Sequence, residues 1–324
     1  MEDFFNYRRR KSSIVNIGNT PLGGDNPIRI QSMANVSTMD TDAAVHQAIR
    51  MIEAGAEYVR FTAQGEREAR NLGAIRKQLD EAGYTTPLVA DIHFNPRAAD
   101  AAAEEVEKVR INPGNYVDKV KTFDLLEYTD EEYAAELQKI RDRFIPFLNI
   151  CKAHGTAIRI GVNHGSLSDR IMSRYGDTPE GMVASCMEFL RICREEDFPD
   201  VVISIKASNT VVMVKTVRLL VRTMESEDMH YPLHLGVTEA GDGEDGRIKS
   251  AVGIGALLSD GIGDTIRVSL SEDPEAEIPV ARKLVDYILE REGHEPLEAT
   301  PAPEYDPVTV GRRHSRVTEG IGGN

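Results

Sequence analysis

The sequence predicts an α/β protein of the (β/α)8 TIM-barrel class. Short apolar runs alternate with longer segments of helical periodicity, and this unit occurs eight times along the 324 residues. Repeated strand–helix units are typical of a parallel barrel surrounded by helices. The rival architecture is a doubly wound sheet, which carries a Gly-rich phosphate turn after its first strand. Here that turn is QSMANVST, without GxGxxG, and this disfavours the rival.

The strand candidates are short runs rich in aliphatic residues. They are PIRIQSM (27–33), YVRFTA (58–63), PLVADIH (87–93), KVRINPG (108–114), AIRIGVN (157–163), VVISIKA (201–207), PLHLGVT (232–238) and DTIRVSL (264–270). Segments between them, such as DAAVHQAIRMIEAGA, repeat apolar residues at the helical period. We expect an elaborated loop between strands 4 and 5, because the long segment there contains a helix of its own, EEYAAELQKIRDRFIPFLNICKAH.

The chain is predicted to have three parts. Residues 1–26 form an N-terminal arm, and residues 27–291 form the barrel, which binds the substrate. Residues 292–324 are rich in Pro and Gly and have no periodicity, which indicates a linker or the start of a further, inserted domain.

Composition and charge exclude several classes of partner. The formal net charge of −15 disfavours nucleic acid and anionic membranes. No apolar stretch reaches the roughly 18 residues that a membrane-spanning helix needs. The three cysteines, Cys151, Cys186 and Cys193, include no CxxC pair and fit no disulfide framework. We therefore expect a cytoplasmic protein in which these cysteines make no metal site.

Polar residues gather at the predicted C-terminal ends of the strands, where a barrel carries its chemistry. Several of them are two positions apart, as Arg110 and Asn112 are, and residues i and i+2 of a strand face the same side. Each such pair can point into the barrel while the apolar residue between them, here Ile111, faces the helices. The candidate site residues are Arg60, Asp91, His93, Arg110, Asn112, Arg159, Asn163, Lys206, Glu239, Arg267 and Ser269.

The balance of charge among these residues predicts the kind of ligand. Five of them are cations on five different strands, and the acids that accompany them are Asp91 and Glu239. Buried cations without matching anions are strongly destabilising, and a bound polyanion resolves the imbalance. Because guanidinium groups match phosphate oxygens in pairs, we expect a diphosphate-sized ligand. Singly, each residue has a structural alternative, such as an ion pair for Asp91 or a structural hydrogen bond for His93.

Several motifs occur in an order that resembles a known family. They are QSM, VADIHF, RINPGN, RIGVNHGSL, KAS, YPLHLGVTEAG, KSAVGIG and GIGDTIRVSL. Over roughly residues 27–290 the chain resembles the 4-hydroxy-3-methylbut-2-enyl diphosphate synthases, above all the three-domain type of plants and Bacteroidetes. That family converts 2-C-methyl-D-erythritol 2,4-cyclodiphosphate to 4-hydroxy-3-methylbut-2-enyl diphosphate by reductive ring opening and loss of water. The step belongs to the non-mevalonate (MEP) pathway of isoprenoid biosynthesis.

The resemblance implies roles and partners that the residues alone do not define. The cationic residues, with His93, Asn112, Asn163 and Ser269, would hold the diphosphate and the neighbouring hydroxyls, and Glu239 would act as the catalytic acid. A [4Fe-4S] cluster would deliver electrons from ferredoxin or flavodoxin, and the full-length protein would be a homodimer. The family ligates its cluster through cysteines of a C-terminal domain, two of them in a CxxC pair, which this sequence lacks.

We therefore expect the barrel portion of a longer enzyme, able to bind substrate but inactive by itself. Two alternatives stay open at this point. One is a barrel enzyme of the pterin-binding type, whose ligand would carry a flat ring. The other is a non-enzymatic phosphosugar-binding module.

Overall fold

The computed structural model describes residues 6–92, 94–117, 127–293, 295, 315–321 and 323. Within them, parallel strands form one eight-stranded sheet. The strands are β1 (Arg29–Met33), β2 (Tyr58–Ala63), β3 (Leu88–Ile92), β4 (Lys108–Ile111), β5 (Ala157–Asn163), β6 (Val201–Lys206), β7 (His234–Leu235) and β8 (Thr265–Ile266). Their order in the sheet is β6-β5-β4-β3-β2-β1-β8-β7.

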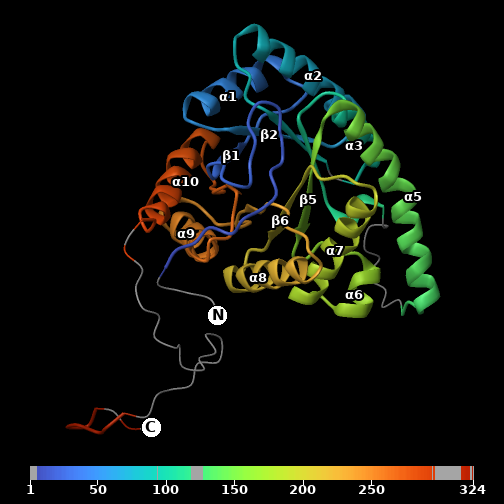
Figure 1. Cartoon of the computed structure of the whole chain (residues 1–324). Coiled ribbons are helices and arrows are strands. Elements are labelled where there is room, and N and C mark those ends of the chain that lie inside the picture. Colours follow the sequence, from blue (N-terminus) through green and yellow to red (C-terminus); the bar gives the residue numbers. More distant parts are fainter. Residues whose placement is uncertain are drawn as a thin grey trace.

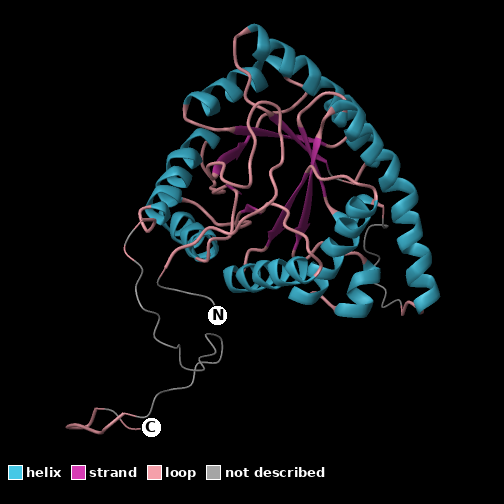
Figure 2. Ribbon diagram, viewed as in Figure 1, coloured by secondary structure: helices cyan, strands magenta, loops and turns pink. Residues whose placement is uncertain are grey.

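The two outer strands of that order meet, so that the sheet closes into a barrel. A parallel bridge joins Ile203 of β6 to Leu233, and the Ile203 N–H donates to the Pro232 carbonyl at 3.0 Å. Helices surround the strands on all sides in Figures 1 and 2. The predicted (β/α)8 barrel is confirmed.

Most of the helices follow a strand and cover the outside of the barrel. Their buried faces are apolar, as in α8, where Met213, Val217, Leu220 and Met224 recur at helical spacing. The helices in the described residues are α1 (Thr41–Glu53), α2 (Glu66–Glu81), α3 (Pro96–Ala103), α4 (Pro113–Tyr116), α5 (Asp130–His154), α6 (Asp169–Tyr175), α7 (Pro179–Glu195), α8 (Thr210–Ser226), α9 (Gly243–Ser259) and α10 (Pro274–Leu289).

The expected strands β7 and β8 are much shorter than predicted. β7 has two residues because Pro232 lacks an N–H group and Gly236 follows closely. The residues that follow β7 and β8 nevertheless continue the barrel wall, since the Arg267 N–H donates to the Leu235 carbonyl at 2.9 Å. Position along the barrel, rather than strand length, is what the site requires.

The elaborated connection between β4 and β5 is present. It contains the short helix α4 and the long helix α5, which begins with a capping box between Thr129 and Glu132 and ends at Gly155 with φ of 66°. Its middle part, residues 118–126, lies outside the described residues. Tyr116, Phe144, Phe147 and Phe189 pack their rings together and join α4 and α5 to α7. The predicted helix is confirmed.

The N-terminal segment closes the base of the barrel, the end at which the strands begin. It is the dark blue trace that crosses the strands in Figure 1. Val15 and Leu22 form an antiparallel bridge, and both are fully buried. They lie in an apolar cluster with inward-facing residues of β2, β3, β5 and β6. The members of this basal cluster are Val15, Ile17, Leu22, Tyr58, Val89, Ala157 and Val202.

The three-part division of the chain stays a prediction, with one qualification. The predicted arm, residues 1–26, is in its described part a packed component of the barrel base rather than a separate arm. In the predicted linker, residues 294, 296–314, 322 and 324 lie outside the described residues. No helix in the described parts of the chain is long and apolar enough to cross a membrane.

Candidate anion-binding site at the barrel mouth

Strand register brings three candidate residues to one level of the barrel interior. Asp91 on β3 pairs with Arg110 on β4, and Arg110 pairs with Arg159 on β5. Because side chains alternate along a strand, all three face the same side of the sheet. All three are buried. The i, i+2 spacing in the sequence predicted an inward direction for Asp91 and Arg110, and Arg159 shares that direction.

The five predicted cations converge inside the mouth of the barrel. Arg60, Arg110, Arg159 and Lys206 are buried, and the Arg267 side chain is 13% exposed. Burial lowers the pKa of Arg60, Arg159 and Lys206, the last two strongly, and neighbouring cations of the group lower each pKa further, whereas Asp91 raises those of the two arginines. The charged forms of these side chains are therefore disfavoured by burial and by their mutual repulsion unless an anion offsets them.

Asp91 accepts from two of these guanidinium groups. One Arg60 nitrogen donates to Asp91 Oδ2, and Arg110 Nη1 lies 3.2 Å from Asp91 Oδ1. Arg110 Nη2 also donates to the Gly161 carbonyl at 2.8 Å. Asp91 is fully buried. We infer that its carboxylate orients the two arginines, which is the structural alternative that the sequence left open.

A second buried acid, which the sequence analysis missed, accompanies Arg267. Glu277 of α10 is 2% exposed and lies 3.2 Å from both Arg267 Nε and Nη2. It also accepts from the Ser32 hydroxyl at 2.9 Å and from the Leu270 N–H at 3.0 Å. A sequence signal existed, since Glu277 shares the buried face of an amphipathic helix with Ala281.

Glu239, the predicted acid, lies elsewhere on the surface of the mouth. It follows β7 in the left-handed region with φ of 52°, which is unusual for a residue with a side chain. Its side chain is exposed, and in the described residues its carboxylate forms no ion pair with the five cations. Its catalytic role stays a prediction.

The remaining predicted residues take different places. Asn112 is buried and caps α4, and its Nδ2 donates to Ser166 Oγ at 3.1 Å. Asn163 ends β5 and is half-buried, and Ser269 after β8 is half-buried as well. His93 lies outside the described residues. The contacts of these residues with a ligand stay a prediction.

Two glycines make room for the cations. A Cβ at Gly161 would lie 2.5 Å from Arg110 Nε, and a Cβ at Gly236 would lie 3.0 Å from Lys206 Nζ. Both glycines stand at inward positions of the barrel, two residues after Arg159 and His234 respectively. An added side chain at either place would displace a cation, so these glycines belong to the site.

Below the cations lies a polar layer that the sequence analysis did not include. Gln31, Lys108, His234 and Thr265 are buried, and their side-chain polar atoms have no hydrogen-bond partner in the described residues. Lys108 Nζ lies 4.1 Å from the centre of the Tyr58 ring. Burial strongly lowers the pKa of Lys108 and of His234. Lys108 was detectable, because it stands two residues before Arg110 on the same strand face.

Two adjoining cavities reach the mouth at Arg267. One, of about 600 Å³, is lined by Asn35, Glu272 and Glu277 among others, and the second, of about 520 Å³, is lined by Thr62 and other residues. Arg267 and Met33 border both cavities. A ligand in either cavity would therefore have access to the cationic group from the side of β1 and β8.

The cysteines do not fit an iron–sulfur cluster. Cys151, Cys186 and Cys193 lie on α5 and α7, outside the strands, and are fully buried. Burial raises the pKa of each thiol, whereas cluster ligation requires thiolates. In the described residues no three His, Cys, Asp or Glu side chains are placed to hold a metal ion.

Fold and site together define a (β/α)8 barrel with a cluster of buried cations at its mouth. The chain matches the GcpE TIM-barrel domain over residues 12–282, and it belongs to that family. Its curated relatives carry the name 4-hydroxy-3-methylbut-2-en-1-yl diphosphate synthase (flavodoxin). The family predicted by the resemblance is confirmed.

The similarity to these relatives is high over nearly the whole chain. The protein of Parabacteroides distasonis is 87% identical over 320 residues, which are 99% of this chain and 52% of the relative. That of Bacteroides thetaiotaomicron is 72% identical over 321 residues, again 99% and 52%. That of Porphyromonas gingivalis is 66% identical over 307 residues, or 94% and 52%. The chain thus spans about half the length of the curated relatives it matches.

Solved structures of other proteins share the fold. Dihydropteroate synthase of Stenotrophomonas maltophilia has a TM-score of 0.56 and 14% identity, covering 88% of this chain and all of its own. N-acetylneuraminic acid synthetase of Leptospira borgpetersenii has a TM-score of 0.54 and 13% identity, covering 91% and 95%. At such low identity these likenesses support the barrel fold alone.

Proposed function

We propose that this barrel binds 2-C-methyl-D-erythritol 2,4-cyclodiphosphate at its mouth. The longer protein to which it corresponds converts this compound to 4-hydroxy-3-methylbut-2-enyl diphosphate. The single observation that carries the proposal is the group of five inward-facing cations accompanied by two buried acids. The names of the relatives, all diphosphate synthases, point to the same chemistry.

The charge of the site supports a diphosphate rather than a neutral ligand. Asp91 and Glu277 each hold guanidinium groups in place, but Arg159 Nε and Nη1 have no hydrogen-bond partner in the described residues. Unpaired buried donors of this kind cost free energy unless a ligand accepts from them. Phosphate oxygens match their geometry, so binding the diphosphate relieves the repulsion among the cations.

Each part of the chain's own site has a proposed task. Arg60, Arg110, Arg159, Lys206 and Arg267 bind the two phosphates. Asn163 and Ser269, with His93, contribute hydrogen bonds to the phosphates or hydroxyls. Glu239, on its exposed loop, approaches the substrate when the loop closes and supplies a proton to the reacting carbon or the leaving hydroxyl.

Electrons must come from outside the described barrel. A [4Fe-4S] cluster would supply single electrons in the proposed reaction, and we propose that the residues that hold it lie outside this chain, which covers about half of its relatives. Flavodoxin is the proposed donor to the cluster, in agreement with the relatives' names. We further propose a cytoplasmic homodimer for the full-length protein.

Calorimetric titration of the chain with the cyclic diphosphate tests the binding proposal. Arg110→Ala should weaken binding by about 1.5–3 kcal/mol, the range for a charge-assisted hydrogen bond. Lys215→Ala is the matched control, because Lys215 is exposed on α8 and does not border the mouth. Unchanged affinity of the Arg110 variant, with an intact thermal melt, would contradict the proposed site.

The same titration separates the two alternatives. A pterin-binding barrel would bind a flat heteroaromatic compound such as a pterin more tightly than the cyclic diphosphate. A phosphosugar-binding module would bind sugar monophosphates as well as it binds the cyclic diphosphate. Neither result is expected here, because five converging cations favour two phosphate groups.

A further inference from the structure

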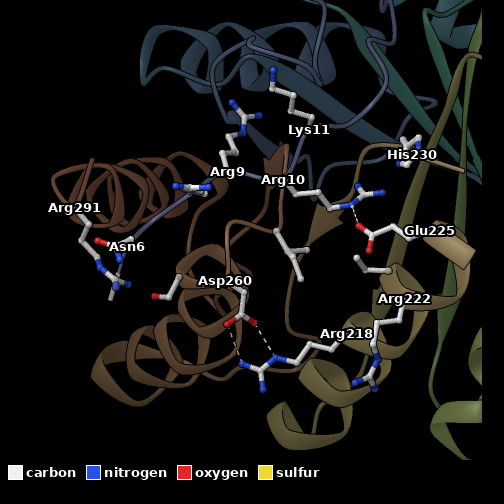
Figure 3. Close-up of a pocket in the computed structure, with 14 residues that line it drawn as sticks. Asn6, Arg9, Arg10, Lys11, Arg218, Arg222, Glu225, His230, Asp260 and Arg291 are labelled. Atoms are coloured by element: carbon white, nitrogen blue, oxygen red, sulfur yellow. Dashed lines mark hydrogen bonds and ion pairs between the residues drawn. The ribbon is translucent and has the colours of Figure 1, made fainter. Parts of the chain in front are cut away.

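A second group of cations lies at the base of the barrel, far along the strands from the mouth. It surrounds a cavity of about 710 Å³ between the N-terminal segment, the C-terminal half of α8 and the turn after α9. We call it the basal cleft. Its charged lining residues are Arg8, Arg9, Arg10, Lys11, Arg218, Arg222, Glu225, Asp260 and Arg291. Figure 3 shows these side chains on several sides of one space.

The cations of the basal cleft outnumber its acids. In the described residues, seven Arg and Lys side chains line it together with two carboxylates. Both carboxylates are already paired, Glu225 with Arg10 at 3.3 Å and Asp260 with Arg218 at 2.7 and 3.1 Å. The chain as a whole has a net charge of −15, so this local surplus of positive charge runs against the general field.

The side chains of three of the cations have no hydrogen bond or ion pair with another described residue. These are Arg8, Lys11 and Arg222, and all three are exposed toward the cleft. Surface arginines and lysines in an acidic protein usually lie close to carboxylates, which are abundant here. Their gathering around one cavity, without described acids of their own, indicates an anion that comes from outside the chain.

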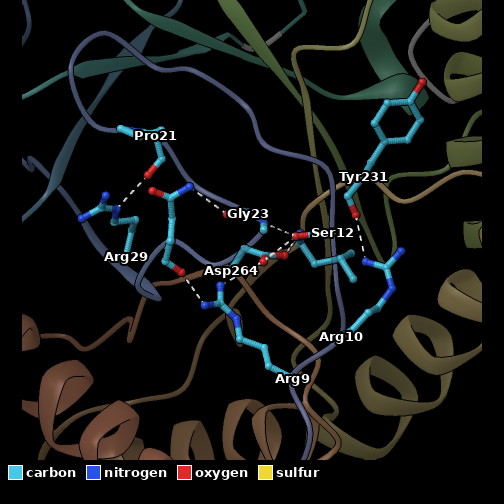
Figure 4. Close-up of polar contacts among 11 residues, drawn as sticks. Arg9, Arg10, Ser12, Pro21, Gly23, Arg29, Tyr231 and Asp264 are labelled. Carbon is cyan, nitrogen blue, oxygen red and sulfur yellow. Dashed lines mark hydrogen bonds and ion pairs between the residues drawn. The ribbon is translucent and has the colours of Figure 1, made fainter.

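The N-terminal segment that carries Arg8, Arg9, Arg10 and Lys11 is fixed to the barrel by hydrogen bonds and an ion pair. Arg9 Nη2 lies 3.1 Å from Asp264 Oδ1, and the same oxygen accepts from the Ser12 hydroxyl at 2.7 Å. Arg10 donates to the Tyr231 carbonyl at 3.1 Å, and its N–H donates to the Gly261 carbonyl at 2.8 Å. Figure 4 shows the side-chain contacts. The cleft is therefore preorganised, which lowers the entropic cost of binding.

The lining defines the chemical class of the ligand. Among the described residues, Val221 and Ile262 are the aliphatic ones that line the cleft, and the rest of its lining is polar or charged, so the cleft favours a charged ligand over an apolar one. Guanidinium groups from the N-terminal segment, from α8 and from Arg291 approach from different sides (Figure 3). That arrangement fits a compact ligand with several negative charges better than an extended acidic peptide.

We propose that the basal cleft is a second anion site, which binds a small polyphosphate carrying at least two phosphate groups. It is separate from the mouth and independent of the function proposed there. Because the N-terminal segment both lines the cleft and plugs the base, binding should also stabilise the fold.

Titration calorimetry with inorganic pyrophosphate, in about 0.15 M salt, tests the proposal. The wild-type chain should bind two equivalents. The double variant Lys11→Glu/Arg222→Glu should lose one of them, or weaken it by roughly tenfold or more. The mouth variant Arg110→Ala/Lys206→Met should keep the equivalent that the double variant loses. Pyrophosphate should raise the melting temperature of the mouth variant and not that of a chain in which all four residues are changed.

Lys215→Glu supplies the matched control, since it reverses an exposed charge on the same helix without lining the cleft. An equal loss in this control would show general electrostatics and overturn the proposal. So would a single equivalent that Lys11→Glu/Arg222→Glu leaves unchanged, or tighter binding of a hexaglutamate peptide than of pyrophosphate. Cyclic diphosphate binding at the mouth should survive the basal substitutions, so the two proposals can fail separately.

Discussion

The same strands form the mouth and the base of the barrel, but cations line the mouth and apolar side chains pack at the base. Tyr58 and Arg60 lie two positions apart on β2, and Ala157 and Arg159 lie two positions apart on β5. Tyr58 and Ala157 pack against the N-terminal segment in the basal cluster. Arg60 and Arg159 belong to the group of cations at the mouth. A step of two residues, about 7 Å, therefore converts an apolar core into an anion site.

The residues that stabilise the fold and the residues proposed to bind the ligand therefore lie at opposite ends of the barrel axis. At the base, apolar side chains fill the interior and favour the folded state. At the mouth, buried cations with unpaired atoms disfavour it. Lys108 of the polar layer pairs with Val89 and Ala157, so it stands level with the basal cluster. The base can thus stabilise a fold whose mouth is held ready for a ligand, in line with the general use of barrel ends.

The largest expected effect concerns turnover and requires the full-length protein. Glu239→Gln keeps the size of the side chain and removes its acid function. If Glu239 supplies a proton, turnover should fall about 10²–10⁴-fold, while affinity for the cyclic diphosphate changes little. Anaerobic kinetics with a chemical reductant, compared with calorimetric binding, measure both.

Glu244→Gln is the matched control, because Glu244 lies on the same stretch of chain in the first turn of α9. It should retain turnover. Near-normal turnover of the Glu239 variant would remove this residue from the chemistry and direct attention to Glu277, the acid that lies beside Arg267.

The next effect concerns stability and belongs to the base. Leu22→Ala should lower the free energy of unfolding by about 2–5 kcal/mol, because Leu22 is fully buried in the basal cluster. Ile14→Ala, in the same segment but 57% exposed, should change it little. Denaturant unfolding gives both values. Cyclic diphosphate affinity should stay at the wild-type value, and a loss comparable to that of Arg110→Ala would contradict the separation of the two regions.

The fold and the direction of several site residues were predictable from the sequence for physical reasons. Inward and outward residues alternate in a strand, so the spacing of polar residues predicts an inward direction for Asp91 and Arg110. The boundaries of α5 coincide with local signals in the sequence, the capping box at Thr129 and the glycine at Gly155.

The features that the sequence did not predict depend on contacts between distant segments. Glu277 reaches Arg267 only because α10 packs beside β1, and Leu22 is buried only because the N-terminal segment folds under the barrel. No periodicity describes such contacts. Whether Glu239 faces the cations also depends on the conformation of its loop, in which Glu239, Gly241 and Gly243 all have positive φ. Sequence patterns predict which face of a helix or strand is buried far better than they predict which distant segment packs against that face.

The smallest expected effect is a fractional proton uptake, and it probes the mouth directly. In the empty site, burial and then Arg60, Arg159, Arg267 and Arg110 lower the pKa of Lys206, so its ammonium form is disfavoured. The cyclic diphosphate brings negative charge and should raise that pKa again. The ligand has no proton to release near neutral pH, since each phosphorus carries one strongly acidic oxygen. Binding should therefore take up less than about one proton per ligand.

Calorimetry in buffers of different ionisation enthalpy measures this uptake, which Lys206→Met should reduce and Lys215→Met should not. The lowered pKa of Lys206 also makes the folding stability of the chain depend on pH. Between the lowered pKa of Lys206 in the folded state and its unfolded value of about 10.4, the unfolded chain holds the extra proton. The wild-type chain should thus gain stability relative to Lys206→Met as pH rises through that window, and bound ligand should flatten the difference. Equal pH profiles for the two chains would mean that Lys206 is not desolvated at the mouth.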